Sequence, residues 1–357
     1  MSATPLFTAK DWWIYRGEGT ATEKRARLAE HRPPWRAFEG EPDPGYAPPG
    51  TSGPAWAETH KRGSGYVPDE AEVNAVNTAL HLRRPLLVTG KPGVGKSTLA
   101  HSIAADLELG PVLHWPVTSR SSLRDGLYHY DAIGRLHDAN LRHLEGTGRG
   151  RARSPLRARS GSIAPYLRLG PLGTALLPQE RPRVLLVDEI DKSDIDLPGD
   201  LLTVFEEGSF EIPELARIAA RQPVVGVGTQ DDPELRVGIE RGRVQCRAFP
   251  VVVLTSNGER DFPPPFLRRC IRLHVEPPGR EKLTQIVRQR LGLDETSGDD
   301  QYRDIVEAFI ARRTEGDLAT DQLLNAVQLR LSGAWSGTAE RTDFLDTVLQ
   351  RLTGPLA

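Results

Sequence analysis

The chain has 357 residues, with 46 lysines and arginines against 48 aspartates and glutamates, and a formal net charge of −2. This length predicts about two domains, and the near-neutral balance excludes a globally basic nucleic-acid coat protein and a polyanionic tail protein. Two cysteines, Cys246 and Cys270, exclude a disulfide scaffold and a CxxC metal or redox site, so we expect ordinary reduced thiols in a cytoplasmic protein.

Apolar runs in this sequence are short. The longest have about four residues, whereas a membrane-spanning helix needs about 20. The first residues lack the charged start and following apolar stretch of a signal peptide. We therefore expect a soluble protein with no membrane insertion.

Residues 1–66 predict an extended N-terminal arm. Proline pairs and several glycines interrupt this region, and a helical period is present only over residues 23–31. Disordered segments are poor in aromatic residues, so we expect the aromatic side chains of the arm to dock on the globular body; a floppy tail is the alternative. Four of the six tryptophans lie here: Trp12, Trp13, Trp35 and Trp56.

Residues 67–277 alternate between helix and strand signals. Short, wholly apolar strands between helices indicate a parallel sheet covered on both faces. Helical spacing of apolar residues predicts helices over residues 70–82, 97–109 and 197–207. Apolar runs predict strands at 85–89, 112–117, 184–187 and 251–255.

Residues 278–357 predict a small all-helical domain. Helical periods occur at 282–291, 302–312, 320–331 and 344–352, with no strand signal between them. The expected fold class is therefore α/β, with a parallel-sheet core, a helical C-terminal domain and the N-terminal arm.

Residues 141–168 are locally basic, with Glu145 as the single acid. A solvated insertion loop and a contact with nucleic-acid phosphates or an acidic protein both fit this composition. No aromatic residue interleaves the arginines before Tyr166, so stacking on single strands is not supported. The seven arginines are Arg142, Arg149, Arg151, Arg153, Arg157, Arg159 and Arg168.

The strongest motif lies between a predicted strand and a predicted helix. Residues 90–97 read GKPGVGKS and match the P-loop pattern GxxxxGK[ST]. Glycines let backbone N–H groups surround phosphates, and the helix start adds its positive end. We expect Lys96 to reach the β- and γ-phosphates of ATP and Ser97 to ligate Mg²⁺. The expected nucleotide-contacting residues here are Gly90, Lys91, Pro92, Gly93, Val94, Gly95, Lys96, Ser97 and Thr98.

Polar side chains follow two of the predicted strands. Asp188 and Glu189 end the apolar run 184–187, at the edge where open α/β sheets bind ligands. We expect Asp188 to hold Mg²⁺ through water and Glu189 to polarise the attacking water; a helix N-cap is the alternative. Asn257 follows the run 251–255, and its amide suits both water and γ-phosphate, whereas a turn before Gly258 is the alternative.

Arg268 and Arg269 follow three consecutive prolines. The prolines predict a rigid approach, and a guanidinium is permanently charged and forked. We expect one of the two to act in trans on the γ-phosphate of a neighbouring subunit. The alternative is a pair of exposed surface arginines.

These four elements, in this order and followed by a helical lid, resemble an AAA+ ATPase. Finer features resemble the MoxR-type branch and its dynein-related relatives. The resemblance implies a nucleotide-binding domain at 67–277, with an insertion at about 119–180 and a β-hairpin insertion at about 209–250, and a lid at 278–357. The resemblance to this branch rests on the segments 121–128, 131–136, 166–173 and 206–212.

The resemblance implies a ring, usually a hexamer, that hydrolyses ATP to remodel a protein client, with a von Willebrand factor A domain protein as partner. A GTP-using restriction subunit shares the dynein-related relationship, so a nucleic-acid motor is an alternative. A nucleotide-gated scaffold is another, against which the intact Glu189 argues.

Two details of the resemblance concern the nucleotide. Tyr66 and Val67 resemble the strip that lines adenine in AAA+ proteins, with a helix-entry staple as the alternative. The family often has an arginine at the start of the lid helix near residues 317–324, where this chain has none. Arg313 and Arg330 are the nearest, and we assign no second-sensor role.

Overall fold

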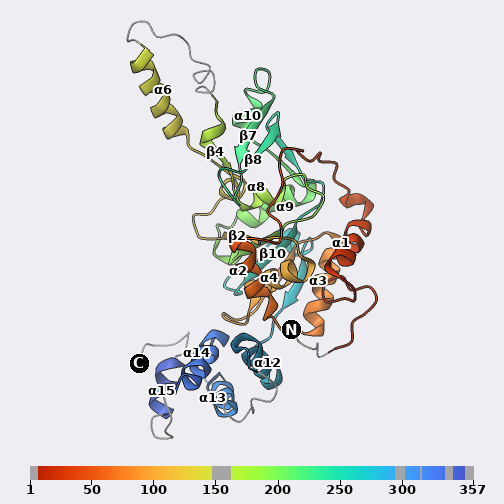
Figure 1. Ribbon diagram of the computed structural model, residues 1–357, viewed down its shortest axis with the longest axis vertical. Helices are drawn as coiled ribbons and strands as arrows, with labels where there is room; N and C mark the ends of the chain where they lie inside the picture. The colour runs from red at the N-terminus through yellow and green to blue at the C-terminus, as the bar shows by residue number, and fades with distance from the viewer. Residues whose placement is uncertain (1–6, 147–161, 294–301, 314–315, 334–340, 350–357) are drawn as a thin grey trace.

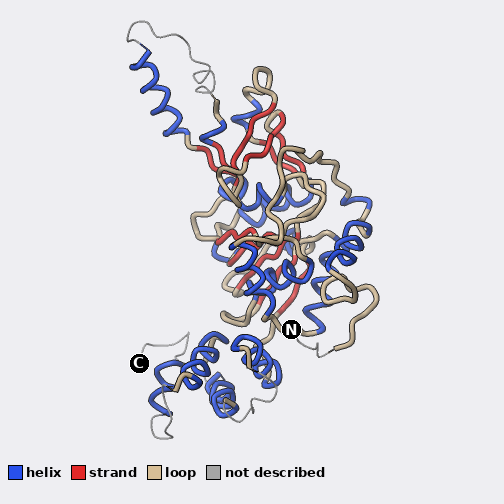
Figure 2. The backbone as a smooth tube through the Cα atoms, in the orientation of Figure 1, coloured by secondary structure: helices blue, strands red, loops and turns tan. Residues whose placement is uncertain are grey.

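A computed structural model describes residues 7–146, 162–293, 302–313, 316–333 and 341–349. Figure 1 shows an α/β body with a group of helices at its C-terminal end and one long helix projecting from the opposite end. Strands gather in the body and are absent from the described part of the C-terminal group (Figure 2). The predicted α/β class with a parallel core and C-terminal helices is confirmed.

The central sheet has five strands in the order β11-β1-β10-β5-β2. Every neighbouring pair is parallel, with Leu86 opposite Val253 and Val251 opposite Val184. All carboxyl ends therefore open at one edge, where a ligand site is expected. The strands are β1 (Leu86–Thr89), β2 (Leu113–Pro116), β5 (Val184–Asp188), β10 (Val251–Ser256) and β11 (Ile271–His274).

Helices cover both faces of this sheet because successive strand residues point to opposite sides. Leu86 and Val88 pack with α3 (Glu70–Leu82) and α4 (Lys96–Leu107). Leu87 instead joins the core under α8 (Pro171–Ala175) and α9 (Leu197–Glu207). The helices and strands predicted in this region are confirmed with shifts of at most about two residues at their ends.

A second, four-stranded sheet has the order β3-β4-β7-β8. It joins the two insertions, because β4 from the first pairs in parallel with β7 from the second. The second insertion is a long hairpin, in which β7 pairs with β8 and β6 with β9. The strands are β3 (Tyr128–Tyr130), β4 (Leu167–Leu169), β6 (Ser209–Glu211), β7 (Val224–Gly228), β8 (Arg236–Glu240) and β9 (Arg243–Gln245).

Helix α6 (Ala132–Gly146) projects away from this second sheet (Figure 1). Most of the basic stretch follows it, and residues 147–161, with five of its arginines, lie outside the described residues. Arg168 is described and donates to the carbonyl oxygens of Thr229 and Gln230. The short helical elements of this region are α5 (Leu123–Leu127), η3 (Ala164–Tyr166), η4 (Ile190–Lys192), α10 (Pro213–Ala216) and α11 (Pro264–Leu267).

The C-terminal helices have a core of their own. Leu283, Ile305, Phe309 and Leu323 are buried together there. The four predicted helical segments correspond to four helices. These are α12 (Arg280–Leu291), α13 (Arg303–Arg313), α14 (Thr320–Leu331) and α15 (Arg341–Val348).

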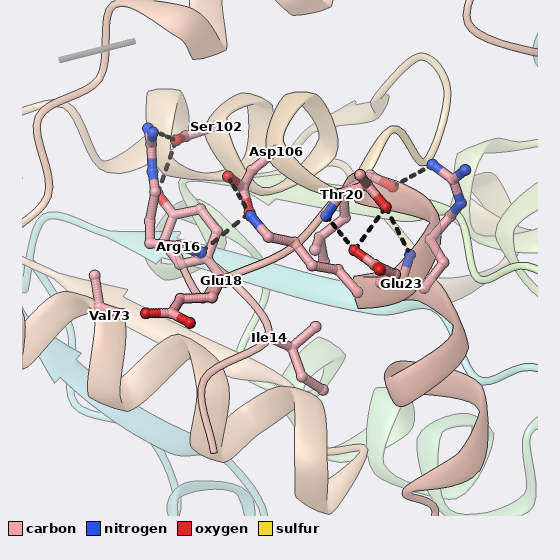
Figure 3. Close-up of polar contacts among 12 residues, drawn as sticks. Ile14, Arg16, Glu18, Thr20, Glu23, Val73, Ser102 and Asp106 are labelled. Carbon is pink, nitrogen blue, oxygen red and sulfur yellow. Dashed lines mark hydrogen bonds and ion pairs between the residues drawn. The ribbon is translucent and has the colours of Figure 1, made fainter. Parts of the chain in front are cut away.

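The N-terminal arm packs against α3 and α4 (Figure 3). Trp13, Ile14 and Tyr15 are at most 1% exposed. The side chain of Asn77 binds this stretch through its amide: Oδ1 accepts from the backbone N–H groups of Ile14 and Tyr15, and Nδ2 donates to the Tyr15 carbonyl. The described arm from residue 7 is therefore anchored to the nucleotide-binding body.

Polar contacts to α4 also hold the arm in place. The Arg16 side chain donates to the Ser102 hydroxyl, and the Arg16 backbone N–H donates to the Asp106 carboxylate (Figure 3). Lys24 of α1 (Ala21–Glu30) pairs with Asp106 at 3.0 Å while only 8% of its side chain is exposed. Helix α1 itself begins with a capping box at Thr20.

The expected docking of aromatic side chains is confirmed for Trp13, Tyr15, Phe38 and Tyr46, which are at most 8% exposed. The indole N–H of Trp13 donates to Asn74 inside the contact. Trp12 and Trp35 are exceptions, at 43% and 74% exposed.

One expectation for the arm was wrong, because a second helix, α2 (Pro54–Ser64), forms where no helical period was found. It contacts α4 through a small residue, since an added Cβ at Gly63 would lie 2.2 Å from the His101 carbonyl oxygen.

Both cysteines are buried and free, and burial raises the pKa of each thiol to about 12. Along the described part of the chain, no helix combines the length and apolar character needed to cross a membrane.

Candidate functional site

The P-loop connects the carboxyl end of β1 to the first residue of α4. Gly93 and Gly95 have φ angles of 75° and 99°, which are strained for residues with a Cβ. They turn the backbone so that Lys96 begins the helix. The loop therefore presents the positive helix end to the edge of the sheet.

The Lys96 ammonium occupies the mouth of the loop. Its Nζ donates to the carbonyl oxygens of Gly90 at 2.7 Å and Lys91 at 2.9 Å, and to Oδ1 of Asn257 at 2.7 Å. Only 7% of the residue is exposed, and burial lowers the pKa of Lys96 although nearby carboxylates oppose the shift. A phosphate oxygen of a bound nucleotide could therefore replace one of these carbonyl oxygens as the hydrogen-bond acceptor of the Lys96 ammonium.

Asp188 accepts hydrogen bonds from three other elements. Oδ1 accepts from the hydroxyl groups of Ser97 at 2.7 Å and Thr255 at 2.5 Å, and Oδ2 lies 3.3 Å from Nε2 of His114. Burial favours the neutral acid, but the hydrogen bonds from His114, Thr255 and Ser97 outweigh it and lower the pKa of Asp188 to about 2. A fully charged carboxylate therefore stands beside the P-loop serine.

Glu189 follows with a left-handed backbone, φ 60°. Its N–H donates to the Thr255 hydroxyl at 2.9 Å, which fixes this conformation. Its carboxylate is 43% exposed and pairs with Lys192 at 2.7 Å. The side chain lines the same cavity as Lys96 and Ser97 and remains accessible to water.

Asn257 is positioned by a residue that the sequence analysis did not single out. The buried carboxylate of Asp191 accepts from the backbone N–H groups of Asn257 at 2.9 Å and Glu259 at 3.1 Å. This fixes the turn after β10, so that the Asn257 amide faces Lys96. The sequence signal that could have identified Asp191 is its position, because it lies in the same DEID run as Asp188.

A cavity of about 620 Å³ lies between the P-loop and the C-terminal helices. Its volume suits a nucleotide-sized ligand. Tyr66 and Val67, 8% and 6% exposed, form part of its wall, and the Tyr66 ring lies against Gly95. The cavity brings together the following predicted residues: Pro92, Gly93, Val94, Gly95, Lys96, Ser97, Thr98, Asp188, Glu189 and Asn257.

The lid supplies wall residues that sequence reasoning missed. The N–H of Thr320, the first residue of α14, donates to the Gly93 carbonyl at 3.3 Å, and Asp317 pairs with Lys91 at 2.6 Å. Lys282 and Arg290 of α12 also face the cavity. No sequence motif marks Lys282 and Arg290 as site residues, since both lie in an ordinary amphipathic helix.

The two arginines nearest the start of the lid helix make contacts away from the cavity. Arg313 donates to the Pro278 carbonyl and lies over the Phe309 ring. Arg330 pairs with Asp304 at 3.4 Å. Neither lines the cavity.

Arg268 and Arg269 lie at the opposite edge of the sheet from the P-loop. They precede β11, which runs parallel to β1, and the P-loop follows the far end of β1. Arg84, just before β1, donates to the Arg268 carbonyl. Four-residue strands span about 13 Å, so both arginines are separated from the chain's own nucleotide cavity.

The two side chains differ in their surroundings. Arg269 pairs with Glu206 at 3.0 Å. The Arg268 guanidinium is exposed and has no polar partner among the described residues. Arg268 is thus the freer of the two to reach a neighbouring molecule.

A family model described as the AAA domain of the dynein-related subfamily matches residues 85–270, more than half of the chain. The chain belongs to the dynein-related AAA family. No curated protein matches it in a sequence search. The match spans the P-loop, the DEID strand, Asn257 and both arginines, and it indicates an AAA+ ATPase. Tyr66 and Val67 and the wall residues of the lid lie outside the matched residues.

The donor set of this AAA domain fits Mg²⁺. That ion takes oxygen ligands and usually combines one or two carboxylates with phosphate oxygens and water. The Ser97 hydroxyl and the charged Asp188 carboxylate, 2.7 Å apart, provide such a pair at the P-loop. Among the described residues, no group of three or more His, Cys, Asp and Glu side chains forms a separate metal cluster.

Proposed function

We propose that this chain is a MoxR-type AAA+ ATPase that hydrolyses ATP between the subunits of a ring and thereby remodels or activates a protein partner. The observation that carries the proposal is the separation of the site into two sheet edges. Lys96, Ser97 and Asp188 gather at one edge, and Arg268 is exposed at the other. One molecule therefore holds two halves that would meet only across an interface.

Each residue has a role in this proposal. Lys96 and the loop N–H groups bind the phosphates, while Ser97 and Asp188 hold Mg²⁺, which would neutralise phosphate charge. Glu189 accepts a proton from the attacking water, and Asn257 orients that water. Arg268 or Arg269 of the neighbouring subunit stabilises charge on the γ-phosphate.

The experiment is complementation between two inactive variants. Lys96→Ala and Arg268→Ala should each lose at least about 10³-fold in turnover. In an equimolar mixed ring, one interface in four combines an intact P-loop with an intact arginine, so about a quarter of wild-type turnover should return. If Arg268→Ala and Arg269→Ala both hydrolyse ATP at the wild-type rate, the shared site is refuted.

The protein partner is the finer part of the proposal. Helix α6, which projects from the body in Figure 1, exposes Ile133 and Leu136 by 84% and 63%. Their i, i+3 spacing puts both on the same face of the helix. Such a stripe is typical of a helix that meets another protein. We infer that a von Willebrand factor A domain protein binds here and changes the ATPase rate. Ile133→Ser with Leu136→Ser should abolish that change while basal turnover persists.

A nucleic-acid motor is the second candidate, favoured by the basic stretch at residues 141–168. It predicts salt-dependent DNA binding that is lost when Arg149, Arg151, Arg153, Arg157 and Arg159 are neutralised. The absence of DNA binding by the unchanged chain would refute this candidate, and DNA binding that survives the substitutions would refute the role of the basic stretch.

A further inference from the structure

A second cavity, of about 470 Å³, lies between the arm and the body. Residues of α1 form one wall, and the loops at 180–182 and 247–249 form the other. These loops immediately precede β5 and β10, so the cavity opens at the sheet edge opposite the nucleotide cavity. We call it the arginine cleft.

The lining of this cleft is strongly basic. Among the described residues that line it, six are arginines and one, Glu180, is acidic. Three of the arginines have acidic partners: Arg25 pairs with Glu108, Arg36 with Glu206 and Arg247 with Glu180. The other three have no carboxylate partner among the described residues; they are Arg32, Arg83 and Arg181.

Arg83 is the most buried of these three arginines. It is 7% exposed, and its guanidinium donates to the backbone carbonyl of Leu28. Burial and the charge of Arg32 lower the pKa of Arg83 to about 10. A buried guanidinium without a counter-ion is unfavourable, and a bound anion would relieve it.

We propose that the arginine cleft binds a compact polyphosphate group, a chain of two or three phosphates. Forked guanidinium groups pair with phosphate oxygens through two parallel hydrogen bonds. The volume lies in the range of small-molecule sites. Phe249, the aromatic residue of the described lining, is 3% exposed, so it offers no ring for a stacked nucleic-acid base.

The test uses the full chain with Lys96→Ala, which weakens binding at the P-loop. Calorimetry with inorganic tripolyphosphate should detect a remaining site. The double change Arg32→Gln with Arg181→Gln should weaken that site at least tenfold. A matched control, Arg120→Gln with Arg221→Gln, removes two exposed arginines outside the cleft and should leave the affinity unchanged.

ATP, a poly-glutamate peptide and a DNA oligonucleotide distinguish the ligand sources. Equal affinity for ATP and tripolyphosphate indicates that the phosphate chain is sufficient, and tighter ATP binding identifies a nucleotide as its source. The proposal is overturned if the Lys96→Ala protein binds no tripolyphosphate, if both double variants bind alike, or if the peptide or DNA binds the cleft more tightly. If the wild-type chain does not hydrolyse ATP, the proposed function at the P-loop fails, but this test of the arginine cleft is unaffected.

Discussion

Glu189 illustrates how one side chain can separate binding from turnover. It lines the nucleotide cavity but contacts Lys192 and not the P-loop. Glu189→Gln should therefore retain ATP affinity while losing about 10²–10⁴-fold in turnover, the usual contribution of a general base. Phosphate release measures turnover, and calorimetry measures affinity. Glu211→Gln, an exposed change on β6, is the control, and undiminished hydrolysis by Glu189→Gln would contradict the role.

His101 links pH to the stability of the α2–α4 contact. Burial, with the charges of Arg62 and His114, lowers the pKa of His101 from 6.5 to about 4. The unfolded chain therefore binds more protons between these values, and the free energy of unfolding decreases as pH falls through this window. The expected loss by pH 4 is of order 3 kcal/mol.

Urea unfolding at pH 7, 6, 5 and 4.5 measures this dependence. His101→Gln should flatten the decrease, because glutamine does not titrate. His60→Gln, an exposed change on α2, the other helix of this contact, should keep the wild-type slope. Equal slopes for wild type and His101→Gln would rule out His101 as the source.

At the residue scale, sequence motifs predicted those site residues whose spacing is local. The P-loop and the DEID run fall within eight consecutive positions each, and the structure places residues 92–97 of the first with Asp188 and Glu189 of the second around one cavity. Lys282 and Arg290 reach that cavity only through the packing of α12. His114 reaches Asp188 because β2 pairs with β5. Such contacts depend on tertiary pairing, which the sequence pattern does not contain.

At the element scale, the arm contains a helix that the pattern of apolar residues did not predict. Its helix α2 lacks an apolar stripe, because it contacts α4 through the close approach at Gly63. Its Thr59 hydroxyl accepts from the N–H of Val112, in the loop before β2. Anchorage of the first stretch depends on Asn77, a polar residue within α3. Helix α3 itself was predicted to the residue, since its period and capping box are local.

Docking of the arm should depend on Asn77 more than on any exposed aromatic residue. Asn77→Ala removes three hydrogen bonds to the arm and leaves two buried N–H groups unpaired, so the free energy of unfolding should decrease by about 2–4 kcal/mol. Trp35→Ala, at a 74% exposed position, should change it by less than about 0.5 kcal/mol. Limited proteolysis of the arm should follow the same order, and an equal effect of both changes would contradict this account.

At the scale of the whole molecule, the nucleotide cavity depends on the position of the lid. Thr320 contacts Gly93, and Asp317 pairs with Lys91, so the P-loop touches the lid directly. An arginine at this helix start is absent, and Ala319 stands against the loop instead. Any ligand that changes the P-loop therefore changes the contact that positions the C-terminal helices.

Gly93→Ala tests this contact. An added Cβ would lie 2.3 Å from the Ala319 Cβ, and φ 75° is strained for alanine. We expect ATP affinity to fall by at least tenfold, because the lid must move away from the loop. Ala319→Gly removes the opposing methyl group, but the Cα of residue 319 still lies 2.6 Å from the added Cβ. The double variant should therefore recover at most a small part of the affinity, since the strain at residue 93 also remains. Calorimetry on the three variants measures the affinities; wild-type ATP affinity in Gly93→Ala would show that the lid contact does not control nucleotide binding.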